Sequence, residues 1–382
     1  MSLIRALWFA ACLLPGAPAF LLRHSSDPST AGQLRNAALV VRTAGDATKN
    51  LELIRLYAKQ LRGTGVKLAV LNDEGDGYVR SDRAVSFVGV QSESHAPLQF
   101  DAGLVSVQRV GYSFSIRTGR VLVAGGNDVP VCGVSWQASR ATYGNGTVGR
   151  MLRHSAHDHF LSLWYVHCRT AWQWNHVEHT WFVEGDARFS GQVGQFFAAY
   201  ANESADLVGS GFRIAGPSWW KYRHIPRNVL SWGNLTLNSR VVRNVSPLPT
   251  LAEGACRDDW AAKDAAGVLF FQEHVMRVSS RLLAYLDAVL ERGIIGPSES
   301  FLAHLCAKQI GSHFQRKKCS IVDFAPLSSR REEGSSQWVS RWWCWNKTYT
   351  SDEDTALCTS EERKSKWYHK VVHSEPLAFD CP

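Results

Sequence analysis

The segment AALVV at residues 37–41 is followed by ATKNLELIRLYAKQLRG at 47–63 and by VKLAVLND at 66–73. The outer segments are short apolar runs typical of buried strands, and the middle segment spaces its apolar residues as a helix does. Strand, helix and strand within about 35 residues predict a βαβ unit and hence a parallel sheet. Because open α/β sheets bind ligands beyond the carboxyl ends of their strands, the loops that follow these two strands are candidate binding loops.

The rest of the chain extends this α/β pattern. We expect strands within 84–140, a helix over 157–174, a strand at 181–183 and a helix over 191–201. The clearest helical pattern covers 272–293, where Val275, Val278, Leu282, Leu286 and Val289 form an apolar stripe. Another helix is expected to begin with Ser298 as its N-cap, and the chain from about residue 312 onward is rich in loops.

The N-terminus has the features of a secretory signal peptide. MSLIR is a basic start, ALWFAACLLPG an apolar core, and Ala17-Pro18-Ala19 a small-residue cleavage site. We therefore expect a signal peptide at 1–19, a flexible leader at 20–35, an α/β domain at 36–311 and a cysteine-containing extension at 312–382 that packs on the same domain. A short membrane anchor is the alternative to cleavage, and APAF is similar to the signal of algal proteins delivered to a complex plastid.

Cysteines and asparagines agree with a secretory route to the Golgi or ER lumen or to the outside. Nine cysteines are present, of which Cys12 belongs to the signal peptide, and the even remainder predicts up to four disulfides. Five asparagines lie in N-x-[ST] sequons. No C-x-x-C pair supports a cysteine zinc site. The net charge of +8 is diffuse, which argues against nucleic acid as a partner and favours an anionic substrate.

Two acids stand where the apolar run Trp181-Phe182-Val183 stops, in HTWFVEGDARFSG (179–191). If the strand continued, Glu184 and Asp186 would point to the same side. Two ionised carboxylates about 4 Å apart repel by about 4 kcal/mol at an effective dielectric constant of about 20. A divalent cation such as Mn²⁺ or Mg²⁺ between them would remove this repulsion and could neutralise a diphosphate leaving group. A solvated surface turn is the alternative interpretation.

Residues 179–209 resemble a group of largely algal and fungal glycosyltransferase-like proteins with an aromatic strand, an E-D-D motif, Ser/Thr-Gly, paired Phe and Asp-Leu. The matching residues are Trp181, Glu184, Asp186, Ser190, Gly191, Phe196, Phe197, Asp206 and Leu207. The chain departs from the pattern at Gly185, where the family has an acid. The resemblance implies the GT-A fold, a Rossmann-like and mostly parallel sheet flanked by helices, with Glu184 and Asp186 as metal ligands.

The same resemblance implies roles for residues elsewhere. Arg42, Thr43 and Asp73 would lie near the base and ribose of the donor. Glu299, in the family's Ser-Glu segment, would act as the catalytic base together with the metal-bound Asp186. His369 would supply a late metal ligand, although a Val replaces the Lys that follows it in relatives. HVMRVSSRLLAYL (274–286) would correspond to the basic helix of the family.

The function implied is metal-dependent transfer of a sugar from a nucleoside diphosphate donor to a glycan or glycoprotein acceptor. The alternative is a decayed transferase scaffold that binds glycans, a role that the 15 tryptophans would suit. A hydrolase with Glu184 and Asp186 as acid and base ranks lower, because acids two residues apart are closer than glycosidases require. The histidines between 154 and 179 match no standard zinc motif. A membrane would be a partner only if the N-terminal segment is retained as an anchor.

Overall fold

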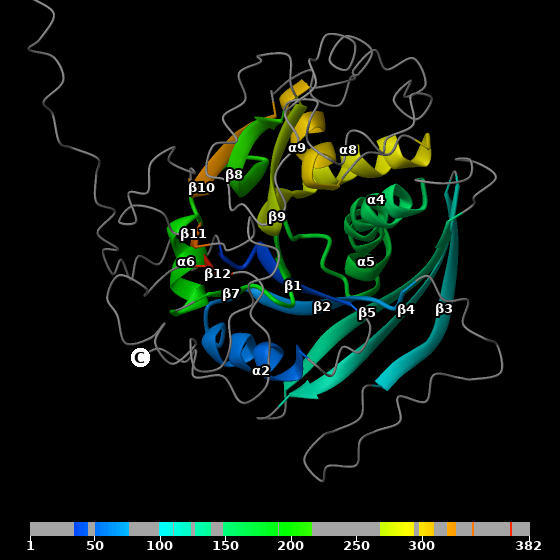
Figure 1. Cartoon of the computed structure of the whole chain (residues 1–382). Coiled ribbons are helices and arrows are strands. Elements are labelled where there is room, and N and C mark those ends of the chain that lie inside the picture. Colours follow the sequence, from blue (N-terminus) through cyan, green and yellow to red (C-terminus); the bar gives the residue numbers. More distant parts are fainter. Residues whose placement is uncertain are drawn as a thin grey trace, which may run out of the picture.

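The computed structural model describes residues 34–44, 50–75, 99–109, 111–123, 127–138, 148–189, 191–215, 268–293, 298–308, 319–325, 338–339 and 367–368. These residues form an α/β fold with a nine-stranded mixed sheet and a small second sheet (Figure 1). The large sheet has the order β10 (Ile321–Ala325), β8 (Leu207–Ala215), β9 (Val268–Ser279), β6 (His179–Glu184), β1 (Ala37–Ala44), β2 (Lys67–Asp73), β5 (Asn127–Ala138), β4 (Tyr112–Val123) and β3 (Gln99–Arg109). Its centre, from β6 through β1 and β2 to β5, is parallel.

Helices cover both faces of this sheet (Figure 1). One face carries α2 (Leu51–Gln60) and α6 (Val193–Ala199), and the other carries α4 (Val148–Leu163), the π-helical turn η2 (Trp164–Cys168), α5 (Arg169–Ala171), α8 (Ser280–Glu291) and α9 (Ser298–Lys308). The central strand β1 is buried on both sides. Ala38 and Val40 pack against the α4, α8 and α9 layer, whereas Leu39 and Val41 pack against α2 and α6. This alternation explains why the strand reads as an unbroken apolar run.

The structure confirms the predicted βαβ unit, because β1 and β2 are parallel neighbours joined by α2. The predicted helix over 272–293 is wrong in its first half. Residues up to Ser279 form β9, and only Ser280–Glu291 are helical. Both faces of strand β9 are buried, since Met276 and Val278 pack into the core on one side of the sheet and Val275 into the core on the other, so its apolar residues need no alternation. The side chain of Ser279 accepts a hydrogen bond from the backbone N–H of Leu282 at 3.1 Å and thereby starts the helix.

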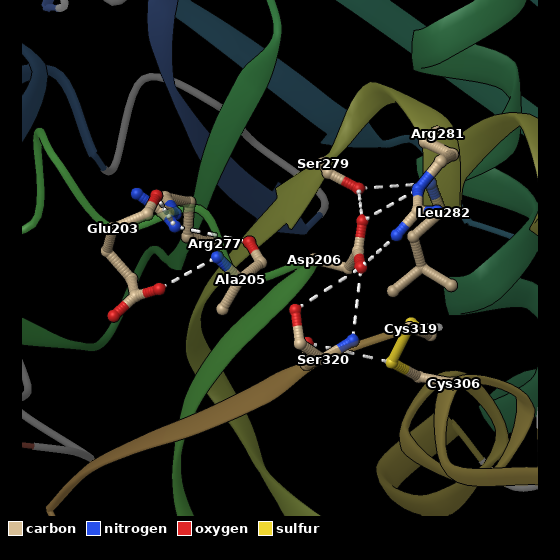
Figure 2. Close-up of polar contacts among 10 residues, drawn as sticks. All are labelled: Glu203, Ala205, Asp206, Arg277, Ser279, Arg281, Leu282, Cys306, Cys319 and Ser320. Atoms are coloured by element: carbon tan, nitrogen blue, oxygen red, sulfur yellow. Dashed lines mark hydrogen bonds and ion pairs between the residues drawn. A yellow bond between two sulfur atoms is a disulfide. The ribbon is translucent and has the colours of Figure 1, made fainter. Parts of the chain in front are cut away.

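The Asp of the Asp-Leu pair anchors the sheet edge (Figure 2). Asp206 Oδ1 accepts from Ser279 Oγ at 2.8 Å and from Arg281 Nε at 3.1 Å, and Oδ2 accepts from the Ser320 backbone N–H at 3.1 Å. Burial alone would raise the pKa of Asp206, but these donors and the charge of Arg281 lower it. One carboxylate therefore joins the start of β8, the start of α8 and the approach to β10.

Two disulfides reinforce the fold within the described residues. Cys132 of β5 is bonded to Cys168 of η2, and Cys306 of α9 to Cys319 before β10. The C-terminal part also adds β11 (Trp338–Val339) and β12 (Trp367–Tyr368), which form the small sheet with β7 (Arg188–Phe189). In the part of the chain that the structure describes, no helix is long and apolar enough to cross a membrane. The predicted signal peptide, residues 20–33 of the predicted leader and residues 84–98 of the segment expected to hold strands lie outside that part. Leu34, near the end of the predicted leader, is buried in the core on the α2 side of the sheet.

Candidate functional site

The candidate site lies where β1 and β6 end, at the carboxyl edge of the parallel centre. From β1 the chain passes through α2 to β2, whereas it reaches β6, on the other side of β1, through the helices of the opposite face. Two neighbouring parallel strands whose connections run to opposite faces of the sheet leave a crevice between the loops at their carboxyl ends. This position is called a topological switch point, and open α/β sheets bind ligands there. Arg42 of β1 and Glu184 of β6 are paired at this point.

A row of charged side chains crosses three neighbouring strands here. Arg42 Nη2 donates to Glu184 Oε1 at 2.7 Å and to the backbone oxygen of Glu273 in β9 at 2.9 Å. Burial alone would lower the pKa of His274 in β9, but the charges of Glu184, Asp186 and Glu273 raise it. The resulting imidazolium donates from Nδ1 to Glu184 Oε2. Both oxygens of Glu184 therefore contact cations that belong to the chain itself.

Glu273 is the buried carboxylate of the site, with 5% of the residue exposed. Ser298 Oγ, at the start of α9, donates to its Oε1 at 2.7 Å, and Nδ1 of His157 in α4 lies 3.7 Å from the same oxygen. Burial alone would raise the pKa of Glu273, but the hydrogen bond and charge of His157 and the charge of Arg42 lower it to about 2. Glu273 is therefore ionised at physiological pH and connects the sheet to two helices. We call Arg42, His157, Glu184, Glu273 and His274 the charged cluster.

Glu184 and Asp186 are arranged differently from two residues of one strand. Strand β6 ends at Glu184, and Gly185 and Asp186 form the turn toward β7. The Asp186 side chain is exposed, whereas Glu184 is half-buried. The charges of both carboxylates raise the pKa of His274. The two acids thus act on one cation, although only Glu184 belongs to the strand.

Gly185 stands where the resembled family has an acid. A Cβ on Gly185 would lie 2.9 Å from Oδ1 of Asn50, the residue that precedes α2. The turn is also held by Arg188, whose Nη1 donates to the backbone oxygens of Gly185 at 2.6 Å and Ala187 at 2.9 Å. A side chain at position 185 would therefore require the side chain of Asn50 to move.

The residues expected near the nucleoside lie at the ends of β1 and β2. Thr43 Oγ1 donates to Asn72 Oδ1 at 2.7 Å, and both residues are buried. Asp73 Oδ1 accepts from Trp136 Nε1 at 3.1 Å and from the backbone N–H of Gly75 at 2.8 Å. The structure thus brings Arg42 and Thr43 to the switch point, whereas Asp73 braces the turn after β2.

Glu299 and His369 are the other two expected site residues. Glu299 is buried in the first turn of α9, directly after Ser298. It therefore stands next in sequence to the residue that donates to Glu273. His369 lies outside the described residues and follows β12, which pairs with β7.

Three residues of the charged cluster escaped the sequence-based site prediction. His157 was considered only as part of a zinc motif, and Glu273 and His274 fell within the wrongly predicted helix. The signal that could have found the last two is a polar Glu-His pair inside the apolar, β-branched run VLFFQEHVMRV (268–278). Adjacent charges in a buried strand require partners, and here the partners come from β1, β6 and α4.

Part of the charged cluster has the donor set of a divalent-cation site. Ligand atoms of His157, Glu184 and Glu273 all lie within 4.8 Å of one another. Carboxylate oxygens suit Mg²⁺ and Mn²⁺, and an imidazole nitrogen is acceptable to Mn²⁺. Arg42 and His274 oppose a further cation electrostatically, because they already contact Glu184. His157, Glu184 and Glu273 are therefore residue types that can bind Mn²⁺ or Mg²⁺. A bound metal would have to compete with Arg42 and His274 for the carboxylate of Glu184.

Comparisons with known proteins assign the chain to no family. No protein-family model matches it, and none of the curated proteins compared with it is a significant match. Function is therefore inferred from the fold and the site.

Proposed function

We propose that the protein is a GT-A-like glycosyltransferase that depends on Mn²⁺ or Mg²⁺ and uses a nucleoside diphosphate sugar as donor. The observation that supports this most is the location of the charged cluster at the switch point between β1 and β6. Departure of a diphosphate develops negative charge, which cations must stabilise. Arg42, His274 and the donor set around Glu184 supply positive charge and cation ligands at that place.

The chain's own residues have distinct roles in this proposal. Arg42 and Thr43 bind the nucleotide end of the donor, and Asp73 keeps the turn after β2 in place. Glu299 accepts the proton of the acceptor hydroxyl as general base, as an inverting reaction requires. A bound cation would neutralise the departing diphosphate, with Asp186 facing it from the turn. The acceptor is a hydroxyl of a glycan or glycoprotein.

The proposed location is the secretory pathway or the extracellular space. Two disulfides join described segments, and such bonds persist in oxidising compartments. Nucleotide sugars are used in the Golgi and ER lumen, so the location and the proposed reaction agree. Retention of the N-terminal segment as an anchor would add a membrane contact, and delivery to a complex plastid is the competing destination.

A second candidate is a glycan-binding protein on a transferase scaffold that has lost activity. Two observations favour it: Glu184 is already neutralised by Arg42 and His274, and Gly185 provides no acid. Such a protein would bind oligosaccharides and would have no affinity for nucleotides.

Donor turnover tests the proposal. The purified chain would be incubated with UDP-sugars or GDP-sugars and Mn²⁺, and the released nucleoside diphosphate would be measured by chromatography. We expect release from one donor class, its loss in Glu184→Gln, and its retention in the matched control Glu178→Gln, whose residue is exposed. Failure of the folded chain to bind or cleave any donor would contradict the transferase proposal, and glycan binding in that case would support the second candidate.

A further inference from the structure

The divalent-cation site can be assigned to specific side chains, and this assignment rests on the proposed function. We propose that the cation is held by His157, Glu184 and Glu273, with Asp186 outside its inner ligands, and that it binds together with a diphosphate. The three ligands come from α4, β6 and β9, so the site exists only when both the helix layer and the sheet edge are in place. This differs from a site formed by the two acids at the strand end.

Position distinguishes the three ligands from Asp186, and burial distinguishes the two glutamates from it. Their donor atoms lie within 4.8 Å of one another, a set to which Asp186 does not belong. The Glu273 side chain is 7% exposed and the Glu184 side chain 20% exposed, whereas Asp186 is exposed on a turn. Ligands that are fixed before the metal arrives lose less conformational entropy when it binds. Ser298 provides this fixation for Glu273.

The contact between Arg42 and Glu184 explains why a diphosphate should accompany the cation. Arg42 Nη2 donates to Glu184 Oε1 at 2.7 Å, so a cation that binds Glu184 would displace the guanidinium from its carboxylate partner. A diphosphate beside the cation would give Arg42 an anionic partner again. Metal and nucleotide should therefore bind with positive cooperativity, which is reciprocal by linkage.

Manganese provides a direct test, because free Mn²⁺ gives an electron paramagnetic resonance signal that disappears on binding. The secreted chain would be titrated with Mn²⁺ alone and with UDP or GDP present. We expect the diphosphate that binds to strengthen Mn²⁺ binding by about tenfold. His157→Gln and Glu273→Gln should each weaken Mn²⁺ binding by at least about tenfold. Asp186→Asn should change it by less than about threefold, with melting temperatures as the control for folding.

A measurement on the unmodified chain protects the test against variants that fail to fold. Pulsed resonance of the bound Mn²⁺ should show coupling to a histidine ¹⁴N. That coupling should be lost in His157→Gln and kept in His369→Gln. Absence of ¹⁴N coupling in the wild type, its loss only in His369→Gln, or a dominant effect of Asp186→Asn would each overturn the assignment. Those outcomes leave metal-dependent transfer intact, whereas absence of any Mn²⁺ and nucleotide binding would defeat the proposed function itself.

Discussion

His159 makes the stability of this protein depend on pH in a way that one substitution should remove. The residue is fully buried in α4, where its ring centroid lies 4.5 Å from that of Tyr112 and 5.1 Å from that of Phe114. Neither ring nitrogen has a hydrogen-bond partner among the described residues. Burial and the charge of Arg109 lower the pKa of His159 from 6.5 to about 3. The ring is therefore a neutral part of the aromatic core.

The sign and size of the effect follow from linkage. Because the pKa is lower in the folded state, the unfolded state binds the proton more readily once the pH falls below 6.5, and stability is lost from there down to about pH 3. Each pKa unit corresponds to about 1.36 kcal/mol. Between pH 7 and pH 5, protonation of His159 in the unfolded chain should therefore lower the free energy of unfolding by about 2 kcal/mol.

Urea unfolding of the wild type and of His159→Phe at both pH values tests this. The difference in stability between the two proteins should shift by about 2 kcal/mol in favour of the variant at pH 5, whatever the offset at pH 7. His176→Gln, which changes an exposed histidine, is the control and should leave the pH dependence as it is. An equal loss of stability in the wild type and His159→Phe would refute the reasoning.

Three other changes test the packing around the site. Arg277→Met removes the donor to three backbone oxygens that follow α6, and we expect a loss of about 1–3 kcal/mol in urea unfolding. Gly185→Ala places a Cβ 2.9 Å from the side-chain amide of Asn50, which can rotate away, and should cost no more than about 1 kcal/mol. Most of that cost should disappear in the background of Asn50→Ala, and a purely additive double mutant would be evidence against the contact. Replacement of Cys306 and Cys319 by alanine opens a loop with a sequence separation of 13 and should cost about 3 kcal/mol, which thermal unfolding would show.

The sequence was informative about the fold where apolar runs and spacing had one interpretation. The βαβ unit at 37–73 and the strand before Glu184 are examples, because each is bounded by polar or glycine residues. The segment 272–293 was ambiguous. Val275, Val278 and Leu282 fit helical spacing, yet a buried strand that leads directly into an amphipathic helix produces the same pattern. Only the position of β9 between two neighbouring strands resolves it.

The site was predictable in part for a similar reason. Glu184 could be selected because it ends a buried strand, a feature visible in a short stretch of sequence. Its contact with His274 joins residues 90 positions apart and depends on the antiparallel register of β6 and β9. The approach of His157 to Glu273 depends on how α4 packs over the sheet. Neither the register nor the helix packing can be derived from local periodicity.

Anomalous diffraction from crystals soaked with Mn²⁺ and the diphosphate that binds, UDP or GDP, would test the central claim most directly. Data collected at the manganese absorption edge would locate the ion without reference to any variant. We expect one strong peak between His157, Glu184 and Glu273, with diphosphate density beside it at the ends of β1 and β6. A fully loaded crystal with no peak at this edge of the sheet, or with nucleotide bound elsewhere, would contradict it.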